Sequence, residues 1–265
     1  MVVVGFIAAI LIGLSLGLIG GGGSILTVPV LVYIFGVDPV LATSYSLLIV
    51  GATSLVGAVS NFKKKQVSIS TTLLFGFSSI TTVFLTRKYL IPIIPENLFS
   101  IGNVVVTHGM LTMLLFASLM VPASLSMIKN KIVIEEPEET VPGKFQMGKL
   151  LSLGMLIGIV TGFLGAGGGF LLIPTLVIIV GLPMKKAIGT SLLIIALNSL
   201  LGFAGDLGHF DVDWKFLLEI LIMAIVGIFI GNALNKKIKA ENLKKGFGWF
   251  VLIMGIYIIA KELFL

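Results

Sequence analysis

The sequence predicts an all-α integral membrane protein made of two inverted repeats, each with about five apolar segments. The first supporting observation is composition: 57% of the 265 residues are hydrophobic, 11% are charged, and the mean hydropathy is +1.15. Soluble domains carry about 45–50% apolar and about 25% charged residues. The chain therefore has too few polar side chains to cover a water-facing surface, which excludes soluble enzymes, nucleic-acid-binding domains and disordered tails.

The second observation is an internal repeat. Residues 17–67 align with residues 162–212 without a gap at an offset of about 145 positions, and about 19 of about 51 pairs are identical. Extended outward, the offset pairs residues 1–120 with residues 146–265, so we predict two membrane repeats of these lengths. The segment between them, residues 121–145, is polar and rich in glutamate, and we expect it to be a cytoplasmic linker.

Each repeat divides into apolar segments in the same order. In the first repeat they cover residues 2–19, 24–36, 41–61, 68–86 and 98–120, and in the second residues 147–164, 169–181, 186–205, 214–231 and 246–263. The second segment of each repeat has about 13 residues and covers about 20 Å as a helix, short of the roughly 30 Å hydrocarbon core. We therefore expect a broken or re-entrant helix there, and about 8 to 10 segments in total.

The third observation is that charges at matched positions differ between the repeats. Cytoplasmic loops of membrane proteins collect lysine and arginine. Lys63–Lys65 follow the third segment of the first repeat, and the second repeat has the acidic stretch 206–213 at the matching place. After the second segment the signs are reversed: the first repeat has Asp38, and the second has Lys185 and Lys186. We therefore predict that the repeats are inverted and that both termini lie outside. Two parallel repeats would instead put the lysine loop and the acidic loop on the same side.

Glycine runs precede both short segments, at Gly20–Gly23 and at Gly165–Gly169, the latter interrupted by Ala166. Non-helical backbone inside a bilayer must be buried in protein or line a watery cavity. Each run leads into a new helix, expected near Ser24 and Gly169, whose first N–H groups lack a partner and whose dipole presents positive charge. Two such helix ends meeting near the midplane predict an anion site. The alternative is close helix packing, which suits the scattered glycines elsewhere.

Two motifs carry this pattern, GLIGGGGSILTVPVLVYIFGVDPVLATSYS and GFLGAGGGFLLIPTLVIIVGLPMKKAIGTS. They resemble the paired signature of the TauE/SafE family of sulfite exporters, also called toluenesulfonate uptake permeases, and the resemblance covers nearly the whole chain. It implies a polytopic, gradient-driven carrier of sulfite, organosulfonates or related sulfur oxyanions in the bacterial cytoplasmic (inner) membrane. The first motif has Ser24 where the second has Gly169, so the halves need not contribute equally. The resemblance fixes neither the substrate nor the direction of transport.

An oxyanion accepts hydrogen bonds, so we expect donors from the breaks and from polar side chains of the third segments. The predicted substrate-binding residues are Gly20, Gly21, Gly22, Gly23, Ser24, Gly165, Gly167, Gly168, Gly169, Ser46, Thr53, Thr190, Ser191 and Asn198. Ser44, Ser54 and Ser199 are further hydroxyls of the same segments. Hydroxyls in membrane helices more often bond their own backbone or a neighbouring helix. No lysine or arginine is expected in the core near the breaks, which predicts weak binding that suits release.

His108 is the main ionisable residue predicted at depth. It falls about midway along the segment 98–120, where an imidazole indicates either proton coupling or a neutral histidine bonded to an adjacent helix. The chain has no cysteine, and His209 with its neighbouring aspartates fits no zinc spacing, so no metal site is predicted. Nucleotide-binding and catalytic motifs are absent from the sequence, so we predict no cofactor and no enzymatic activity.

These features together predict a secondary transporter that moves a small sulfur-containing anion across the cytoplasmic membrane by alternating access. An anion channel is the nearest alternative, and an intramembrane enzyme and a membrane scaffold are further ones. The expected partners are the anion and the lipid bilayer, with no nucleic acid. The sequence is compatible with a monomer or a homo-oligomer.

Overall fold

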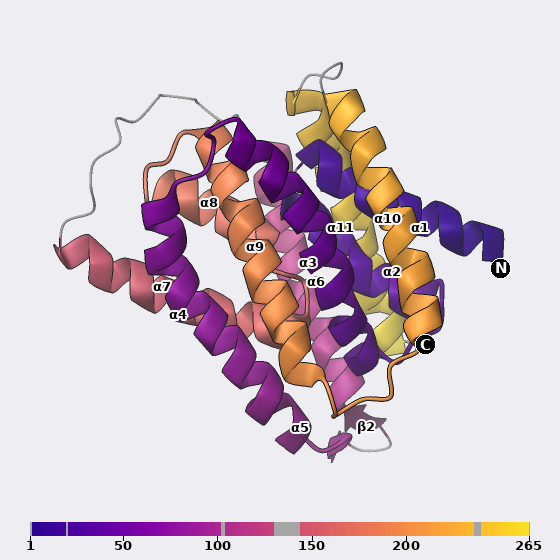
Figure 1. The fold of residues 1–265 in the computed structure, drawn as a ribbon. Coiled ribbons are helices and arrows are strands. Elements are labelled where there is room, and N and C mark those ends of the chain that lie inside the picture. The colour runs from indigo at the N-terminus through magenta and orange to yellow at the C-terminus, as the bar shows by residue number, and fades with distance from the viewer. Residues whose placement is uncertain (1, 20, 102–103, 130–143, 236–239, 265) are drawn as a thin grey trace.

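The computed structural model describes residues 2–19, 21–101, 104–129, 144–235 and 240–264, which form a bundle of helices with one two-stranded hairpin (Figure 1). The first repeat contains α1 Val2–Ile19, the 3-10 helix η1 Gly21–Leu26, α2 Thr27–Tyr33, α3 Pro39–Lys63, α4 Ile69–Leu85, the π-helical turn η2 Thr86–Leu90, α5 Ile91–Ile93, strands β1 Asn97–Ile101 and β2 Val104–Thr107, and α6 His108–Lys129. The second contains α7 Lys144–Leu164, α8 Gly169–Ile178, α9 Met184–Asp206, α10 Trp214–Asn235 and α11 Ala240–Phe264.

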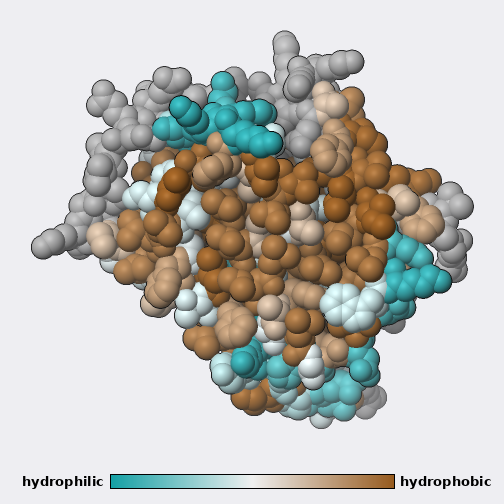
Figure 2. All heavy atoms as spheres, in the orientation of Figure 1, coloured by the Kyte–Doolittle hydropathy of each residue, from teal (hydrophilic) through white to brown (hydrophobic). Residues whose placement is uncertain are grey.

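The helices present an apolar band to the outside. Figure 2 shows hydrophobic residues across the middle of the visible face, with hydrophilic residues above and below them. Phe77, Ile222 and Phe229 are among the exposed apolar side chains. Within the described residues, the helices long and apolar enough to cross a membrane are Pro39–Lys63, Ile69–Ile93, His108–Ser126, Met184–Asp206 and Trp214–Gly231. The prediction of a membrane protein built almost wholly from helices is confirmed.

The region 98–120 is not one helix, as the sequence analysis expected. Its first part forms the hairpin of β1 and β2, and α6 begins only at His108. The physical reason is the β-branched run Val104–Val106, which favours a strand. At its other end α6 continues through Lys129, beyond the expected boundary at residue 121. The acidic stretch of the linker, within residues 130–143, lies outside the described residues.

The fourth segment of the first repeat is longer than the expected residues 68–86. The helix runs from Ile69 to Ile93 and includes the π-helical turn η2, which places Arg87 inside it. A π turn widens a helix by one residue and is frequent at functional sites. The matched helix α10 is α-helical from Trp214 to Asn235, so the two repeats differ here.

Helices α3 and α9 lie against each other and run in opposite directions (Figure 1). A Cβ atom added at Gly57 would lie 3.2 Å from Leu192 Cδ1, and one added at Gly202 would lie 3.2 Å from Leu47 Cδ1. The repeat offset matches Gly57 with Gly202 and Leu47 with Leu192, so the two contacts are reciprocal. The glycines allow the close approach because no side chain keeps the backbones apart.

The outer helices also pair through glycine, and the pairs again match across the repeats. Gly13 of α1 faces the backbone of Ala224 in α10, and Gly158 of α7 faces the backbone of Ser79 in α4. Within each of these two pairs the helices run parallel, because contacts further along each pair follow in the same order. Close packing therefore explains these scattered glycines, as the alternative in the sequence analysis proposed.

Because α3 and α9 are antiparallel, the lysine-rich loops lie at one end of the bundle and the aspartate-containing loops lie at the other. One end of the bundle holds Lys63–Lys65 and Lys185–Lys186, and the Ser68 N–H donates to Thr190 Oγ1 there at 2.9 Å. We call this the basic end. The other end, which we call the acidic end, holds Asp38, Asp206, Asp211 and Asp213, and the Asp213 N–H donates to Tyr45 Oη there at 2.8 Å.

Candidate functional site

The first glycine break forms a tight helical turn. Gly21–Gly23 begin the 3-10 helix η1, which passes into α2 at Thr27, so a helix starting near Ser24 is not observed. In a 3-10 helix each N–H after the first turn donates to the carbonyl three residues earlier. Ser24 and the residues after it therefore offer fewer free amide groups than a fresh α-helix would, and Gly20 lies outside the described residues.

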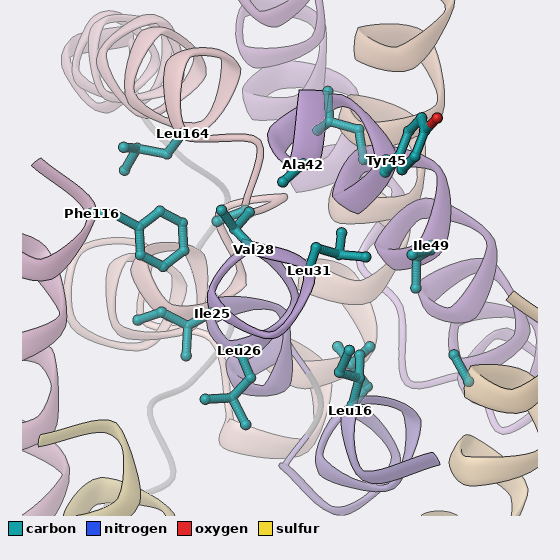
Figure 3. Close-up of a cluster of buried hydrophobic side chains, with 14 of the residues drawn as sticks. Leu16, Ile25, Leu26, Val28, Leu31, Ala42, Tyr45, Ile49, Phe116 and Leu164 are labelled. Carbon is teal, nitrogen blue, oxygen red and sulfur yellow. The ribbon is translucent and has the colours of Figure 1, made fainter. Parts of the chain in front are cut away.

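The segment that follows this break is enclosed by protein. Val28 and Leu31 of α2 are 0% exposed. Figure 3 shows them among Leu16 of α1, Tyr45 of α3 and Phe116 of α6, with further side chains from η1, α3 and α7. Irregular backbone at membrane depth needs such a cover because lipid cannot bond to free N–H and C=O groups.

The second break is buried and depends on glycine. Gly165, Gly167 and Gly168 have φ angles of 67°, 63° and 74°, in the left-handed region that other residues rarely adopt. The helix α8 begins at Gly169, as predicted, with Gly168 as its N-cap. The Leu171 N–H donates to the Gly168 carbonyl at 3.0 Å, so the first two N–H groups of α8, those of Gly169 and Phe170, have no carbonyl partner inside the helix and can serve an external acceptor.

The helices that carry or follow the two breaks lie side by side. Helix α8 contacts η1, and both lie against α9. A Cβ atom added at Gly167 would lie 2.7 Å from Val50 Cγ1 of α3 and 2.8 Å from Ser199 Oγ of α9. Val50 lies near the middle of α3, so this contact is deep within the bundle rather than at either end.

Two of the predicted polar side chains have free hydrogen-bonding capacity at this depth. Ser46 is fully buried, and its hydroxyl has no partner within the described residues. Asn198 Nδ2 donates to Ser79 Oγ at 2.7 Å, and Asn198 Oδ1 has no partner there. The oxygen and nitrogen of an amide are assigned from such networks. If the two are exchanged, Ser79 becomes the donor and Asn198 presents a free N–H group.

The other predicted hydroxyls already have protein partners in this conformation. Thr53 Oγ1 donates to the Ile49 carbonyl at 2.6 Å, and Ser191 Oγ donates to the Ile188 carbonyl at 2.9 Å. Thr190 accepts the bond from Ser68 at the basic end, away from the breaks. Unused polar atoms therefore remain on Ser46 and Asn198, while Thr53 and Ser191 bond their own helices and Thr190 joins α9 to the residue before α4.

Three buried hydroxyls outside the predicted set of binding residues have no hydrogen-bond partner within the described residues. They belong to Ser54, Ser199 and Thr27, each of which is 0% exposed. Ser54 and Ser199 are identical at matched positions of the repeat, and that identity is a signal available from sequence. Thr27 gives no such signal, because its matched residue is Leu172.

His108 does not lie midway along a membrane helix. It is the first residue of α6, and its N–H donates to the Glu96 carbonyl at 2.8 Å. The imidazole is buried, with its ring centre 5.7 Å from that of Phe163. The hairpin before α6 moves His108 to the acidic end, so the expectation of a mid-depth histidine is wrong.

The absence of lysine and arginine was expected only for the core near the breaks, and the structure buries one arginine towards the acidic end. Arg87 is 0% exposed and pairs with Asp206, which is 2% exposed, with 3.3 Å between Nη1 and Oδ2. Both positions had been placed outside the apolar segments. The helix that begins with α4 continues through η2, and α9 extends to Asp206, so these two residues lie inside the bundle.

A bundle of apolar helices with a buried glycine break and partnerless hydroxyls, such as Ser199 beside Gly167, has features of one class of protein, the membrane transporters. A family model described as "Sulfite exporter TauE/SafE" matches residues 5–258, and the chain belongs to this family of membrane transporters.

Curated relatives extend over the same length. A "Probable membrane transporter protein" of Xylella fastidiosa is 31% identical over 255 residues, which cover 95% of this chain and 92% of the relative. "Probable membrane transporter protein YunE" of Bacillus subtilis is 27% identical, covering 98% of this chain and 99% of the relative. "Probable membrane transporter protein MJ0441" of Methanocaldococcus jannaschii is 34% identical over 41% of this chain and 43% of the relative. No solved structure matches the chain.

The buried hydroxyls give a prediction about stability. Ser199→Ala removes a hydroxyl without a partner, so we expect unchanged stability or a gain of up to about 1 kcal/mol. Ser79→Ala removes the partner of the Asn198 amide, and we expect a loss of about 1–3 kcal/mol. Thermal unfolding of the purified variants in detergent measures both. Equal destabilisation would show that Ser199 contributes a hydrogen bond to the folded state and is not held free.

Proposed function

We propose that this TauE/SafE family member is a secondary carrier that moves a small sulfur-containing oxyanion by alternating access. The observation that carries the proposal is the second glycine break, which lies against the middle of α3 and α9, with the segment of the first break packed on the helix that follows it. Secondary transporters bind substrate at such breaks, where half-helix ends and unwound backbone face one spot. The family description points to sulfite, and the relatives are named only as membrane transporters.

Alternating access in this proposal depends on the repeats being inverted. Three features support inversion: the reciprocal contacts of Gly57 and Gly202, the antiparallel course of α3 and α9, and the sorting of lysines and aspartates to opposite ends. An axis that relates two antiparallel membrane helices lies in the membrane plane. Exchange of the two halves then converts an outward-open conformation into an inward-open one.

We further propose that each break is re-entrant. Helices α1 and α10 run parallel, and α10 starts beside the acidic end, so α1 also starts there. Since α3 starts at the acidic end as well, η1 and α2 return from the interior to the end where α1 began. The same argument applied to α7, α8 and α9 returns α8 to the basic end.

The chemistry of the breaks suits an oxyanion. Sulfite and sulfonate groups act as hydrogen-bond acceptors, and the second break offers donors: the N–H groups of Gly169 and Phe170 and the hydroxyl of Ser199. Ser46 and Ser54 of α3 are further buried hydroxyls without a partner within the described residues. The side chains nearest a Cβ added at Gly167, those of Val50, Ser199 and Ile195, carry no charge, which suits a carrier because it must release what it binds. His108 at the acidic end stays a candidate for proton coupling.

The charge distribution sets the orientation that we propose. Lysine-rich loops face the cytoplasm in membrane proteins, so the basic end is cytoplasmic and the acidic end is outside. Both chain ends then lie outside, because α1 starts at the acidic end and Tyr33 beside it bonds Glu262 near the end of α11 at 2.8 Å. The membrane is the cytoplasmic membrane, as the family resemblance implies.

Flux measurements test the carrier directly. Purified protein in liposomes is expected to take up labelled sulfite or a small sulfonate with saturation, and internal unlabelled anion should accelerate uptake by counterflow. Chloride and sulfate serve as competing anions. Flux that rises linearly with concentration and shows no counterflow would identify an anion channel, and absence of flux for all sulfur oxyanions would reject the proposed substrate class.

Substitution at the second break tests the site. Gly167→Val forces a side chain against Val50 and Ser199, so we expect transport to fall at least about tenfold while membrane insertion is retained. Gly36→Val is the matched control, because Gly36 has a φ of 70° and nothing within 4 Å of an added Cβ. It therefore imposes a similar backbone strain without filling the site. Equal flux from the two variants would place the substrate elsewhere.

Labelling from the two sides of the membrane tests the topology. The chain has no cysteine, so Lys64→Cys and His209→Cys each introduce one unique thiol in an exposed position. We expect an impermeant thiol reagent to label position 209 from outside and position 64 only from the cytoplasmic side. Labelling of both positions from one side would rule out the inverted arrangement.

A further inference from the structure

The buried ion pair at the acidic end joins the two repeats and has unused capacity. Nε, Nη1 and Nη2 of Arg87 make no hydrogen bond within the described residues, although Nη1 lies 3.3 Å from Asp206 Oδ2. A guanidinium carries five N–H donors in a planar fork. Asp206 therefore balances the charge of Arg87 without satisfying its donors.

The packing around Arg87 connects it with the second break. A Cβ atom added at Gly205 of α9 would lie 3.2 Å from Arg87 Cβ, so α9 is held close to the π-helical turn. Thr43 contacts Gly165 of the break, and the next residue, Ser44, lies beside the Asp206 carboxyl. The ion pair thus lies between the second break and the exposed loop that starts at Leu207.

The repeat itself indicates that folding does not require these charges. The offset matches Arg87 with Asn232 and Asp206 with Asn61, so the other repeat has two neutral amides at the same two positions. The helices there pair in the same way. Buried ion pairs contribute little stability compared with neutral side chains of similar size, because both charges must leave water. A stabilising role therefore leaves the presence of the charges at this end unexplained.

We propose that Arg87 is an oxyanion-binding residue at the acidic end, and that Asp206 occupies its guanidinium until the anion displaces it. This inference rests on the proposed function, since it takes the transported substrate to be an oxyanion. The guanidinium fork matches two oxygen atoms on one centre, the arrangement in sulfite and sulfonates, and a halide ion cannot form that bidentate pair.

The displaced carboxylate has a route to water. Asp206 is the last residue of α9, and Leu207, Gly208 and His209 after it are exposed, with Gly208 at a φ of 91° that permits an abrupt change of direction. When the anion takes the guanidinium, the end of α9 loses its link to η2. Arrival of the anion and opening of the acidic end are then one event, which gives Arg87 a gating role at this end only.

The two single substitutions are expected to act in opposite directions. Asp206→Asn removes the competing carboxylate, so sulfite should bind about tenfold more tightly or better. Arg87→Gln removes the donors, so sulfite should bind about 10-fold to 100-fold more weakly. Binding is measured as the rise in melting temperature of the purified protein with sodium sulfite, against sodium chloride at equal ionic strength. Lys63→Gln, at the basic end, is the control and should behave as wild type.

The double variant R87N/D206N separates binding from folding. It copies the amide pair of the other repeat, and we expect it to fold and melt near wild type without anion, because both buried charges are removed together. Its melting temperature should not respond to sulfite beyond the chloride control. If a single variant fails to fold, the sulfite response of this double variant still tests whether Arg87 binds the anion.

Two results would overturn the inference. One is a sulfite response in R87N/D206N equal to that of wild type, and the other is equal weakening in Asp206→Asn and Arg87→Gln, which indicates a merely structural pair. Sulfite flux in liposomes is measured separately. If the wild-type protein transports sulfite and the variants give either of these results, only the role of Arg87 is rejected. If the wild-type protein shows no sulfite flux, the proposed function is rejected.

Discussion

Hydrogen bonding of the backbone at the two glycine breaks is the constraint on which the rest of the structure depends. Hydrocarbon offers neither donors nor acceptors, so irregular backbone at membrane depth must be surrounded by protein. The fold meets this requirement by placing η1 and α2 among α1, α3 and α6, and by seating Gly167 against α3 and α9. Glycine at the helix contacts makes this enclosure tight enough, since Gly57 and Gly202 let the two central helices approach closely.

The unsatisfied polar groups that the bundle encloses cost stability. The hydroxyls of Ser54 and Ser199 and the guanidinium of Arg87 are buried with unused donors, and each unsatisfied buried donor costs about 1–3 kcal/mol. A fold selected for stability alone would use apolar side chains at these positions. Ser199 lies beside Gly167, and Arg87 lies between the second break and the acidic end, a distribution that agrees with the oxyanion path that we propose.

Much of the architecture was predictable because the bilayer imposes simple rules on sequence. Apolar stretches located α1, α3, α7 and α9 within a few residues, and the second glycine run located the start of α8. The prediction failed where local preference differed from hydropathy: a β-branched run made a hairpin before α6 and moved His108 to the acidic end. It also failed at Arg87, because a hydropathy boundary at residue 86 does not reveal that a helix continues through a π turn into a buried ion pair.

The sequence by itself determined the membrane class, the two repeats and the glycine breaks, because the number of apolar residues, the repeat offset and the glycine runs are properties of the linear chain. Only the tertiary structure decided which polar side chains are free. Ser46 and Thr53 look equivalent in the sequence, yet Thr53 bonds its own helix and Ser46 has no partner within the described residues. Whether a buried hydroxyl or charge finds a partner depends on distances across helix contacts, and those distances are set by packing between segments far apart in the chain.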